Sequence, residues 1–590
     1  MLDLVFEGAT VFDGSGAPPR SVDVGVQDGY IAEVGRISTR ASRRLDARGA
    51  WLTPGFVDLH THYDGQASWD PHFGPSLQNG VTTVVFGNCG VGFAPLAPGE
   101  RSRAIDDLIS LMEGVEDIPG AALMEGVRFD WQSFPQYLDA LERLPHSLDF
   151  LVQVPHDPLR MAVMGERALE RAQATDEDLT AMQTLLREAL DAGAAGFSTA
   201  RTDNHRTSRG VPTPASEADA RELGALARVF RDRRRGVLQM VSDFDVLHGP
   251  ERFNGEFDLV ELIARESERP LSISWMQRDP GGEQWQGIRA RTEAAAAAGL
   301  PISLQASARG IGVILGLDTT FHPFMGFPGF VEIAALPLAE RAAAMREPTR
   351  KARILSERPG RLSGDGTSVP PIVDLMLARI DLISARMFPL QISTRPGPDY
   401  EPAAAESFRA QAQRHGLPVL EVLYDYLAAG EGRQLIHFPI FNYNAGSLDV
   451  VREMLTHPLA LFGLSDAGAH VGTLCDASTT TFLLTHWARD RRTGTLPPER
   501  LIEMLTSRNA RHMGLIDRGR IAVGLRADLN LIDPARLAIG ETTVARDLPA
   551  GGKRLHQDIQ GYLGTWVAGV SVAENGEPTA ARPGRLVRMR

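Results

Sequence analysis

The stretch Trp51-Leu-Thr-Pro-Gly-Phe-Val-Asp-Leu-His60-Thr-His62 decides how the rest of the chain is interpreted. The run from Phe56 to Leu59 predicts a short buried strand that is entered through the Pro54-Gly55 turn. Side chains alternate between the two faces of a strand, so His60 and His62 point to the same side. Their Cα atoms then lie about 6.6 Å apart, close enough for both imidazoles to bind one metal ion. Ordinary hydrogen bonds at a strand end are the alternative.

The composition is typical of a globular protein with a large core. The chain has 590 residues, of which 43% are hydrophobic and 23% charged. The formal net charge of −13 argues against nucleic acid and anionic membranes as partners. Only two cysteines occur, and neither a signal peptide nor an apolar run of about 18 residues is present. We therefore expect a cytoplasmic protein that acts on a small molecule; the sequence leaves room for a homo-oligomer.

Strand and helix patterns alternate through the middle of the chain, which predicts a parallel sheet. One of the predicted helices begins after Thr175, which is expected to cap it. Eight such units close into an α/β (β/α)8 TIM barrel, whose chemistry lies at the carboxyl ends of the strands. The predicted barrel strands are 56–59, 81–86, 149–154, 196–199, 236–241, 270–276, 301–305 and 459–464.

Both chain ends read as short strands and turns, which predicts a small β-sandwich built from the two ends. Residues 308–430 break the strand–helix rhythm and are too many for a loop, so we expect an inserted subdomain after strand 7, over the barrel mouth. Its residues Phe321, Phe324, Phe327 and Phe330 are expected to form its own core, with an acyl pocket as the alternative. The predicted segments are 1–54 and 515–590 for the β-sandwich, 55–307 for strands 1–7, 308–430 for the insertion, and 431–514 for strand 8 and the final helices.

The residues that follow the predicted strands are rich in metal ligands. They include His60, His62, Cys89, His156, Arg201, Asp466 and His470. In a metal hydrolase, Asp466 would bind the ion and take the proton from a metal-bound water. Capping a turn is the alternative for Asp466, and Cys89 is either a ligand or a small buried hydrophobe.

The other polar residues at the strand ends have two interpretations each. His156 and His470 contact either the substrate or the ion, or only the backbone. Arg201 is expected to bind an anionic group of the substrate. His205 is assigned to a solvated loop, and Cys475 to core packing.

Three motifs in order along the chain carry a family resemblance. They are Gly55-Phe-Val-Asp-Leu-His60-Thr-His62, Gly80-Val-Thr-Thr-Val-Val-Phe-Gly-Asn-Cys89-Gly-Val-Gly-Phe-Ala-Pro95, and Gly519-x-Ile-x-x-Gly-x-x-Ala-Asp528-Leu. The first resembles the first-strand metal motif of the amidohydrolase superfamily. The second resembles N-acyl-D-amino-acid deacylases, the D-aminoacylase-like family, in which this cysteine is a zinc ligand. The third is similar to the closing β-sandwich motif of the superfamily.

The resemblance implies a zinc-activated water that attacks an amide, with Asp466 as general base. It favours an N-acyl D-amino acid or a related amide as substrate. The metal ligands would be His60, His62, Cys89 and Asp466, and the substrate-binding residues His156, Arg201 and His470. A cyclic amide or imide hydrolase, of the hydantoinase or dihydroorotase kind, is the first alternative. A non-catalytic barrel that serves as a scaffold is the second.

The chain departs from the family at strands four, five and six. The deacylases supply a histidine from each of strands five and six, whereas these strands here carry Gln239 and Gln277. Other members use a carbamylated lysine on strand four, but Lys351 and Lys553, the two lysines of the chain, lie far from it. We therefore expect one metal ion per chain. A thiolate ligand favours zinc, and other divalent metals stay open.

Overall fold

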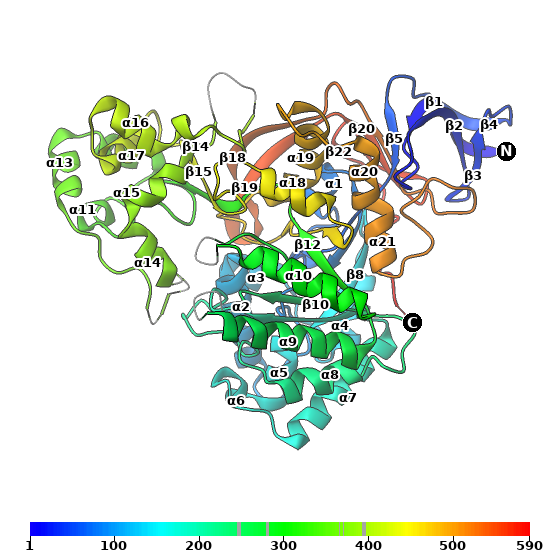
Figure 1. Cartoon of the computed structure of the whole chain (residues 1–590), viewed down its shortest axis with the longest axis horizontal. Coiled ribbons are helices and arrows are strands. Elements are labelled where there is room, and N and C mark those ends of the chain that lie inside the picture. The colour runs from blue at the N-terminus through cyan, green and yellow to red at the C-terminus, as the bar shows by residue number, and fades with distance from the viewer. Residues whose placement is uncertain are drawn as a thin grey trace.

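The computed structural model describes residues 1–244, 249–278, 282–364, 366–367, 369, 371–391 and 397–589. The structure has three parts (Figure 1). A barrel occupies the middle of the chain, a sheet is built from both chain ends, and an inserted lobe stands on the side of the barrel away from β1–β4. No helix among the described residues has the length and apolar character needed to cross a membrane.

The barrel consists of eight parallel strands in the order β16-β12-β11-β10-β9-β8-β7-β6. A parallel bridge between Thr61 and Ala467 joins the two edges of this sheet, just beyond the ends of β6 and β16. The predicted (β/α)8 barrel is therefore confirmed. The strands are β6 (Phe56–Asp58), β7 (Val81–Phe86), β8 (Asp149–Pro155), β9 (Gly196–Arg201), β10 (Val237–Ser242), β11 (Leu271–Ser274), β12 (Ile302–Ala306) and β16 (Ala460–Phe462).

Helices connect the barrel strands. Thr175 caps its helix as predicted, because its side chain accepts a hydrogen bond from the backbone N–H of Asp178. The connection from β7 to β8 is the longest within the first seven strands, and it carries three helices. The helices are α1 (Gly74–Gln78), α2 (Arg101–Glu116), α3 (Gly120–Gly126), α4 (Phe134–Glu142), α5 (His156–Met164), α6 (Glu166–Leu169), α7 (Asp176–Ala192), α8 (Ala220–Arg228), α9 (Pro250–Ser267), α10 (Gln284–Ala297), α18 (Asp449–Thr456), α19 (Thr479–Phe482), α20 (Pro498–Glu503) and α21 (Asn509–His512). Shorter or irregular turns are η1 (Gln66–Ser68), η4 (Asp476–Ser478), η5 (Leu483–Asp490) and η6 (Met504–Arg508).

The two chain ends share one nine-stranded sheet, as the sequence predicts. Its order is β22-β21-β20-β17-β5-β1-β2-β3, with β4 paired to β1. Strands from the two ends meet where β17 pairs antiparallel with β5. The strands are β1 (Leu2–Val11), β2 (Arg20–Gln27), β3 (Tyr30–Gly35), β4 (Ala41–Asp46), β5 (Trp51–Pro54), β17 (Leu529–Ile532), β20 (Tyr562–Val567), β21 (Val570–Glu574) and β22 (Glu577–Pro578).

A hairpin of β18 (Ala538–Leu548), η7 (Pro549–Gly551) and β19 (Gly552–Gln560) leaves this end sheet. It packs on the loop after the last barrel strand, where the Leu555 N–H donates to the carbonyl of Val471. The Gln557 side chain also donates to the Tyr400 hydroxyl, 2.8 Å away, in the inserted lobe. The hairpin therefore touches both the barrel loops and the insertion.

The inserted lobe has its own sheet and its own core. Its sheet has the order β13-β15-β14. Phe324, Phe327 and Phe330 are buried in the lobe's core and Phe321 packs against it, so the expectation that these rings form the core is confirmed. The elements are β13 (Ile311–Gly316), α11 (Pro328–Val331), α12 (Leu338–Met345), α13 (Pro348–Ser356), α14 (Pro371–Leu377), α15 (Ile380–Ile383), η2 (Ser384–Arg386), β14 (Phe388–Pro389), η3 (Ala404–Glu406), α16 (Phe408–His415), α17 (Val419–Ala428) and β15 (Leu435–Phe441).

A buried ion network joins the barrel to the end sheet. Asp149, the first residue of β8, lies 2.7 Å from Arg518 Nη1 and 3.1 Å from Arg526 Nη2. Arg526 also donates to Asp528 at the start of β17. Asp149 and Arg518 have side chains that are 0% and 1% exposed. Each charge therefore depends on its partners for the interactions that water would otherwise supply.

We expect Asp149→Asn to destabilise the protein by about 3–5 kcal/mol, because it leaves two buried arginines without their shared carboxylate. Urea unfolding followed by circular dichroism measures the change. Asp46→Asn is the control, since the Asp46–Arg48 pair is solvent-exposed and contributes little. Equal unfolding midpoints for the two variants would contradict the structural role of Asp149.

Candidate metal centre

Two histidines and a cysteine converge at the carboxyl end of the barrel. His60 and His62 follow β6, and Cys89 lies in the loop after β7. Cys89 Sγ is 3.1 Å from His60 Nε2 and 3.8 Å from His62 Nε2. All three residues are buried, and they form the one group of potential metal ligands found among the described residues. The structure therefore brings together three of the predicted ligands.

Asp466 adds a fourth donor atom from the loop after β16. Its Oδ1 lies 3.4 Å from His60 Nε2 and 3.9 Å from His62 Nε2. The donor set is two imidazole nitrogens, one sulfur and one carboxylate oxygen. This combination suits zinc, and the Asp466 side chain, which is 15% exposed, is the part of the cluster that solvent reaches.

The hydrogen bonds of His60 fix which of its nitrogens faces the cluster. His60 Nδ1 is 2.8 Å from Gln305 Oε1, and Gln305 Nε2 donates to the Ser272 hydroxyl. Because the amide oxygen can only accept, Nδ1 carries the proton. The lone pair of Nε2 is therefore left for an ion, as in metal sites whose histidines are oriented by an outer partner.

Two further glutamines from alternate barrel strands support the same loops. Gln239 of β10 accepts a hydrogen bond from the Cys89 backbone N–H at 2.9 Å. Gln153 of β8 donates to Asn88 at 2.7 Å. Alternate strands of such a barrel contribute side chains to one interior layer. Strand five thus supplies an amide that holds the Cys89 loop rather than a histidine ligand.

Glu116 was not found from the sequence, although it lies against the cluster. It is the last residue of α2 and its side chain is 1% exposed. Its Oε1 lies 3.2 Å from His62 Nδ1, and its Oε2 lies 3.5 Å from His470 Nε2. The residue lies in the connection after the second predicted strand, and no sequence motif links it to the histidines. Only the fold could reveal the contact.

Burial sets the electrostatics of the cluster. It lowers the pKa of His60 to about 4 and raises the pKa of Asp466 to about 7. It also raises the pKa values of Cys89 and Glu116 well above their usual ranges. Each shift has the same cause, since removal from water penalises the charged form. A cation would favour the charged form of both carboxylates and of the thiol, so the donor set is matched to a positive ion.

Two more histidines lie around the mouth. The His470 side chain is 27% exposed, and its backbone N–H donates to the carbonyl oxygen of Glu116. His205 is half-buried, and burial lowers its pKa to about 4, with a further contribution from the charge of His60. The assignment of His205 to a solvated loop is therefore corrected, because its ring is half-buried and its Nδ1 is shielded from solvent.

His156 and Arg201 are tied to other partners. His156 is buried, with Nδ1 2.9 Å from the Thr199 hydroxyl and Nε2 2.8 Å from Glu222. Arg201 makes two hydrogen bonds to the carboxylate of Glu256, at 2.8 and 2.6 Å. The structure does not bring these two residues into the ligand cluster, and helices α8 and α9 supply the acids that hold them.

Arg278 is a buried cation at the same end of the barrel, four residues after β11 ends. Its side chain donates from Nη2 to the carbonyl of Ser242, at the end of β10. Among the described residues, no acceptor faces its Nη1. A guanidinium that is buried and only partly paired can bind a carboxylate.

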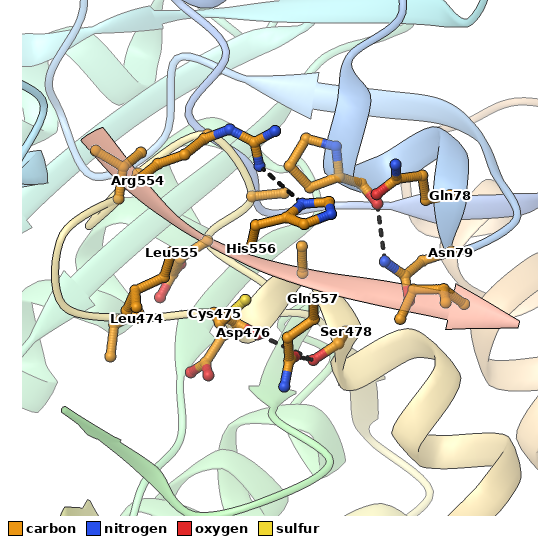
Figure 2. Close-up of a pocket in the computed structure, with 18 of the residues that line it drawn as sticks. Gln78, Asn79, Leu474, Cys475, Asp476, Ser478, Arg554, Leu555, His556 and Gln557 are labelled. Carbon is orange, nitrogen blue, oxygen red and sulfur yellow. Dashed lines mark hydrogen bonds between the residues drawn. The ribbon is translucent and has the colours of Figure 1, made fainter. Parts of the chain in front are cut away.

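A pocket borders the Asp466–Ala469 segment. Figure 2 shows its wall, formed by Gln78 and Asn79 on one side, η4 below, and Arg554 to Gln557 of β19 across it. Cys475 lies in this wall and packs against the main core, as the sequence analysis expects. The hairpin from the end of the chain therefore shapes the approach to the loop that carries Asp466.

Comparisons with known proteins place the chain among hydrolases. The profile of the Amidohydrolase family matches residues 43–573. A D-aminoacylase from Alcaligenes xylosoxydans xylosoxydans is 28% identical over 547 residues, which are 91% of this chain and 89% of the relative. An N-acyl-D-aspartate deacylase from the same organism is 38% identical over 236 residues, 40% of this chain and 42% of the relative.

Solved structures agree with this placement. A D-aminoacylase, described for one-metal activation and second-metal attenuation in its binuclear metal centre, is 25% identical and covers 100% of both chains with a TM-score of 0.63. An N-acyl-D-glutamate deacylase from Bordetella bronchiseptica, complexed with zinc and a phosphonate inhibitor, has a TM-score of 0.61 at 24% identity, and covers 100% of this chain and 99% of that chain. The latter likeness supports the fold.

Proposed function

The chain belongs to the amidohydrolase family, and we propose that it is a metal-dependent hydrolase that cleaves the amide bond of an N-acyl amino acid. The observation that carries this proposal is the buried group of His60, His62 and Cys89 at the barrel mouth, with the Asp466 carboxylate beside both histidines. A barrel kept only as a scaffold would not need these metal-type donors together. The cytoplasmic location and the homo-oligomer stay predictions.

The four donors would hold one zinc ion. When bound, zinc supplies a water of lowered pKa and polarises the amide carbonyl. Asp466 would act as the general base that accepts a proton from the attacking water and returns it to the departing nitrogen, since its carboxylate borders the cluster on the solvent side. His470, at the rim beside Glu116, would contact the substrate.

One ion, rather than two, fits the residues of this chain. Strand five presents Gln239, whose oxygen is engaged by the Cys89 backbone, and strand six presents Trp275 and Gln277. The similar D-aminoacylase is described as activated by one metal and attenuated by a second. A single-ion site is therefore compatible with catalysis in this group.

The substrate class that we favour is an N-acyl D-amino acid. The similar proteins include a D-aminoacylase and two deacylases of N-acyl-D-aspartate and N-acyl-D-glutamate. Arg278 replaces Arg201 as the residue we assign to the substrate carboxylate, because Arg201 is held by Glu256 whereas Arg278 Nη1 has no acceptor among the described residues. A substrate with a free carboxylate would pair with Arg278; a cyclic imide would not.

The metal content of the purified protein tests the ligand assignment. We expect about one zinc ion per chain in the wild type and none in His60→Ala/His62→Ala, because two of four ligands are lost. Plasma mass spectrometry gives the ratio. His415→Ala, a change at an exposed histidine of α16, is the control and is expected to keep the ion. Equal zinc in the double variant and the wild type would rule out this site.

Hydrolysis tests the role of Asp466. We expect Asp466→Asn to lower kcat for N-acetyl-D-amino acids about 100- to 10,000-fold, the usual contribution of a general base. Asp258→Asn, on the exposed side of α9, should leave the rate unchanged. The substrate panel includes N-acetyl-L-amino acids and hydantoins. Faster turnover of hydantoins than of every linear amide would replace our substrate class with a cyclic one.

Steady-state kinetics test Arg278. A charge-assisted hydrogen bond contributes about 1.5–3 kcal/mol, so Arg278→Ala should lower kcat/KM about 10- to 100-fold for substrates with a free carboxylate. The matching amides without that carboxylate should lose little. Arg265→Ala, at an exposed site, is the control. The same loss for charged and uncharged substrates would remove Arg278 from the carboxylate site.

A further inference from the structure

Glu116 is an acid that the proposed chemistry does not use directly, yet it is buried beside it. It ends α2, in the long connection between β7 and β8, and its side chain is 1% exposed. A carboxylate is rarely buried to this degree without partners, because the loss of hydration is costly. The residues around Glu116 should therefore show which interactions compensate for the cost of burying its carboxylate.

The two oxygens of Glu116 face two different histidines. Oε1 is 3.2 Å from His62 Nδ1, and Oε2 is 3.5 Å from His470 Nε2. Neither His62 Nδ1 nor Glu116 Oε1 has a hydrogen-bond partner elsewhere in the described part of the chain. A small rotation of either side chain would turn the 3.2 Å contact into a hydrogen bond. His62 Nδ1 and Glu116 Oε1 can therefore serve as hydrogen-bond partners for each other.

The backbone around Glu116 is anchored on both sides. The backbone N–H of His470 donates to the Glu116 carbonyl oxygen. The next residue, Asp117, accepts hydrogen bonds from the hydroxyls of Thr320 in the insertion and Thr473 in the loop after β16, each at 3.0 Å. The end of α2 is therefore fixed to the same loop that carries Asp466 and His470.

The arrangement parallels that of the other histidine ligand. Gln305 accepts from Nδ1 of His60 and leaves Nε2 toward the cluster. Glu116 stands in the same position relative to His62, with a carboxylate in place of the amide. Histidine ligands of metal sites commonly donate their second N–H to such an acceptor, which fixes the ring and strengthens it as a ligand.

We propose that Glu116 is a positioning residue that orients His62 as a metal ligand and ties it to His470 at the rim of the site. The inference rests on the proposed metal-dependent function. Glu116 accepts the Nδ1 proton of His62 through Oε1, which directs the Nε2 lone pair to the cluster. Through Oε2 the same carboxylate holds His470, so the ligand and the rim histidine move together.

Metal affinity of Glu116→Gln tests this inference. The amide keeps the size of the side chain but removes the charge. We expect zinc to bind about 10- to 100-fold more weakly than to the wild type, in a competition titration with a chromophoric chelator. The visible spectrum of the cobalt-loaded protein should also change, because the ligand field at His62 is altered. Asp106→Asn, on the exposed face of the same helix, is the matched control and should bind as the wild type does.

A second variant separates positioning from folding. Glu116→Asp keeps the charge but withdraws the carboxylate by one methylene from His62, so it should also weaken zinc binding. The thermal unfolding of each variant, measured without metal, shows whether it folds. Lower stability with unchanged zinc affinity and an unchanged cobalt spectrum would mean that Glu116 only supports the fold.

The same titration distinguishes this inference from the proposed function. If the wild type binds no metal, the metal-dependent function itself fails. If the wild type, Glu116→Gln and Glu116→Asp all bind zinc equally tightly, the function stands and the role of Glu116 is overturned. Weaker binding by Glu116→Gln and Glu116→Asp, with normal binding by Asp106→Asn, supports it.

Discussion

The close approach of two buried imidazoles and a buried thiol, with a carboxylate beside them, is the constraint on which the rest of the structure depends. Nε2 of His60 and of His62, Cys89 Sγ and Asp466 Oδ1 come from three separate loops, and the two histidine nitrogens lie 3.1–3.9 Å from the sulfur and from the carboxylate oxygen. Such groups are costly to desolvate unless something fixes their protonation and position. The bridge between Thr61 and Ala467 closes the barrel and joins the loops after β6 and β16 directly beside the cluster. This junction fixes the positions of the side chains that the two loops carry.

Backbone strain is concentrated at the same place. Cys89, Asp466 and His470 all adopt left-handed backbone conformations, with φ of 56°, 46° and 49°. Such conformations cost about 1–3 kcal/mol each in residues other than glycine and persist where the surroundings determine them. Here the surroundings are the amide of Gln239 on the Cys89 N–H and the carbonyl of Glu116 on the His470 N–H. The fold thus places these side chains at an energetic cost, which is typical of functional sites.

Periodicity and strand ends predicted the barrel and the ligand cluster because both depend on local sequence. His60 and His62 share a face by the alternation of one strand, and Cys89 and Asp466 follow apolar runs. Residues whose roles depend on distant helices could not be found in this way. Glu116 meets His62 only through the placement of α2, and Arg201 is held by Glu256 of α9.

The support of the cluster is built from amides on the fifth and seventh barrel strands, β10 and β12. Gln239 and Gln305 are neutral at every physiological pH, so they can orient Cys89 and His60 without adding charge to a buried cluster that already contains Asp466 and Glu116. A histidine in place of Gln239 would be a potential ligand for a second ion, whereas a glutamine is a weak ligand for zinc and a good hydrogen-bond partner. A single cation would favour the charged forms of the two carboxylates and the thiol. An amide on strand five therefore suits the support of the proposed ligand Cys89 rather than the binding of a second ion.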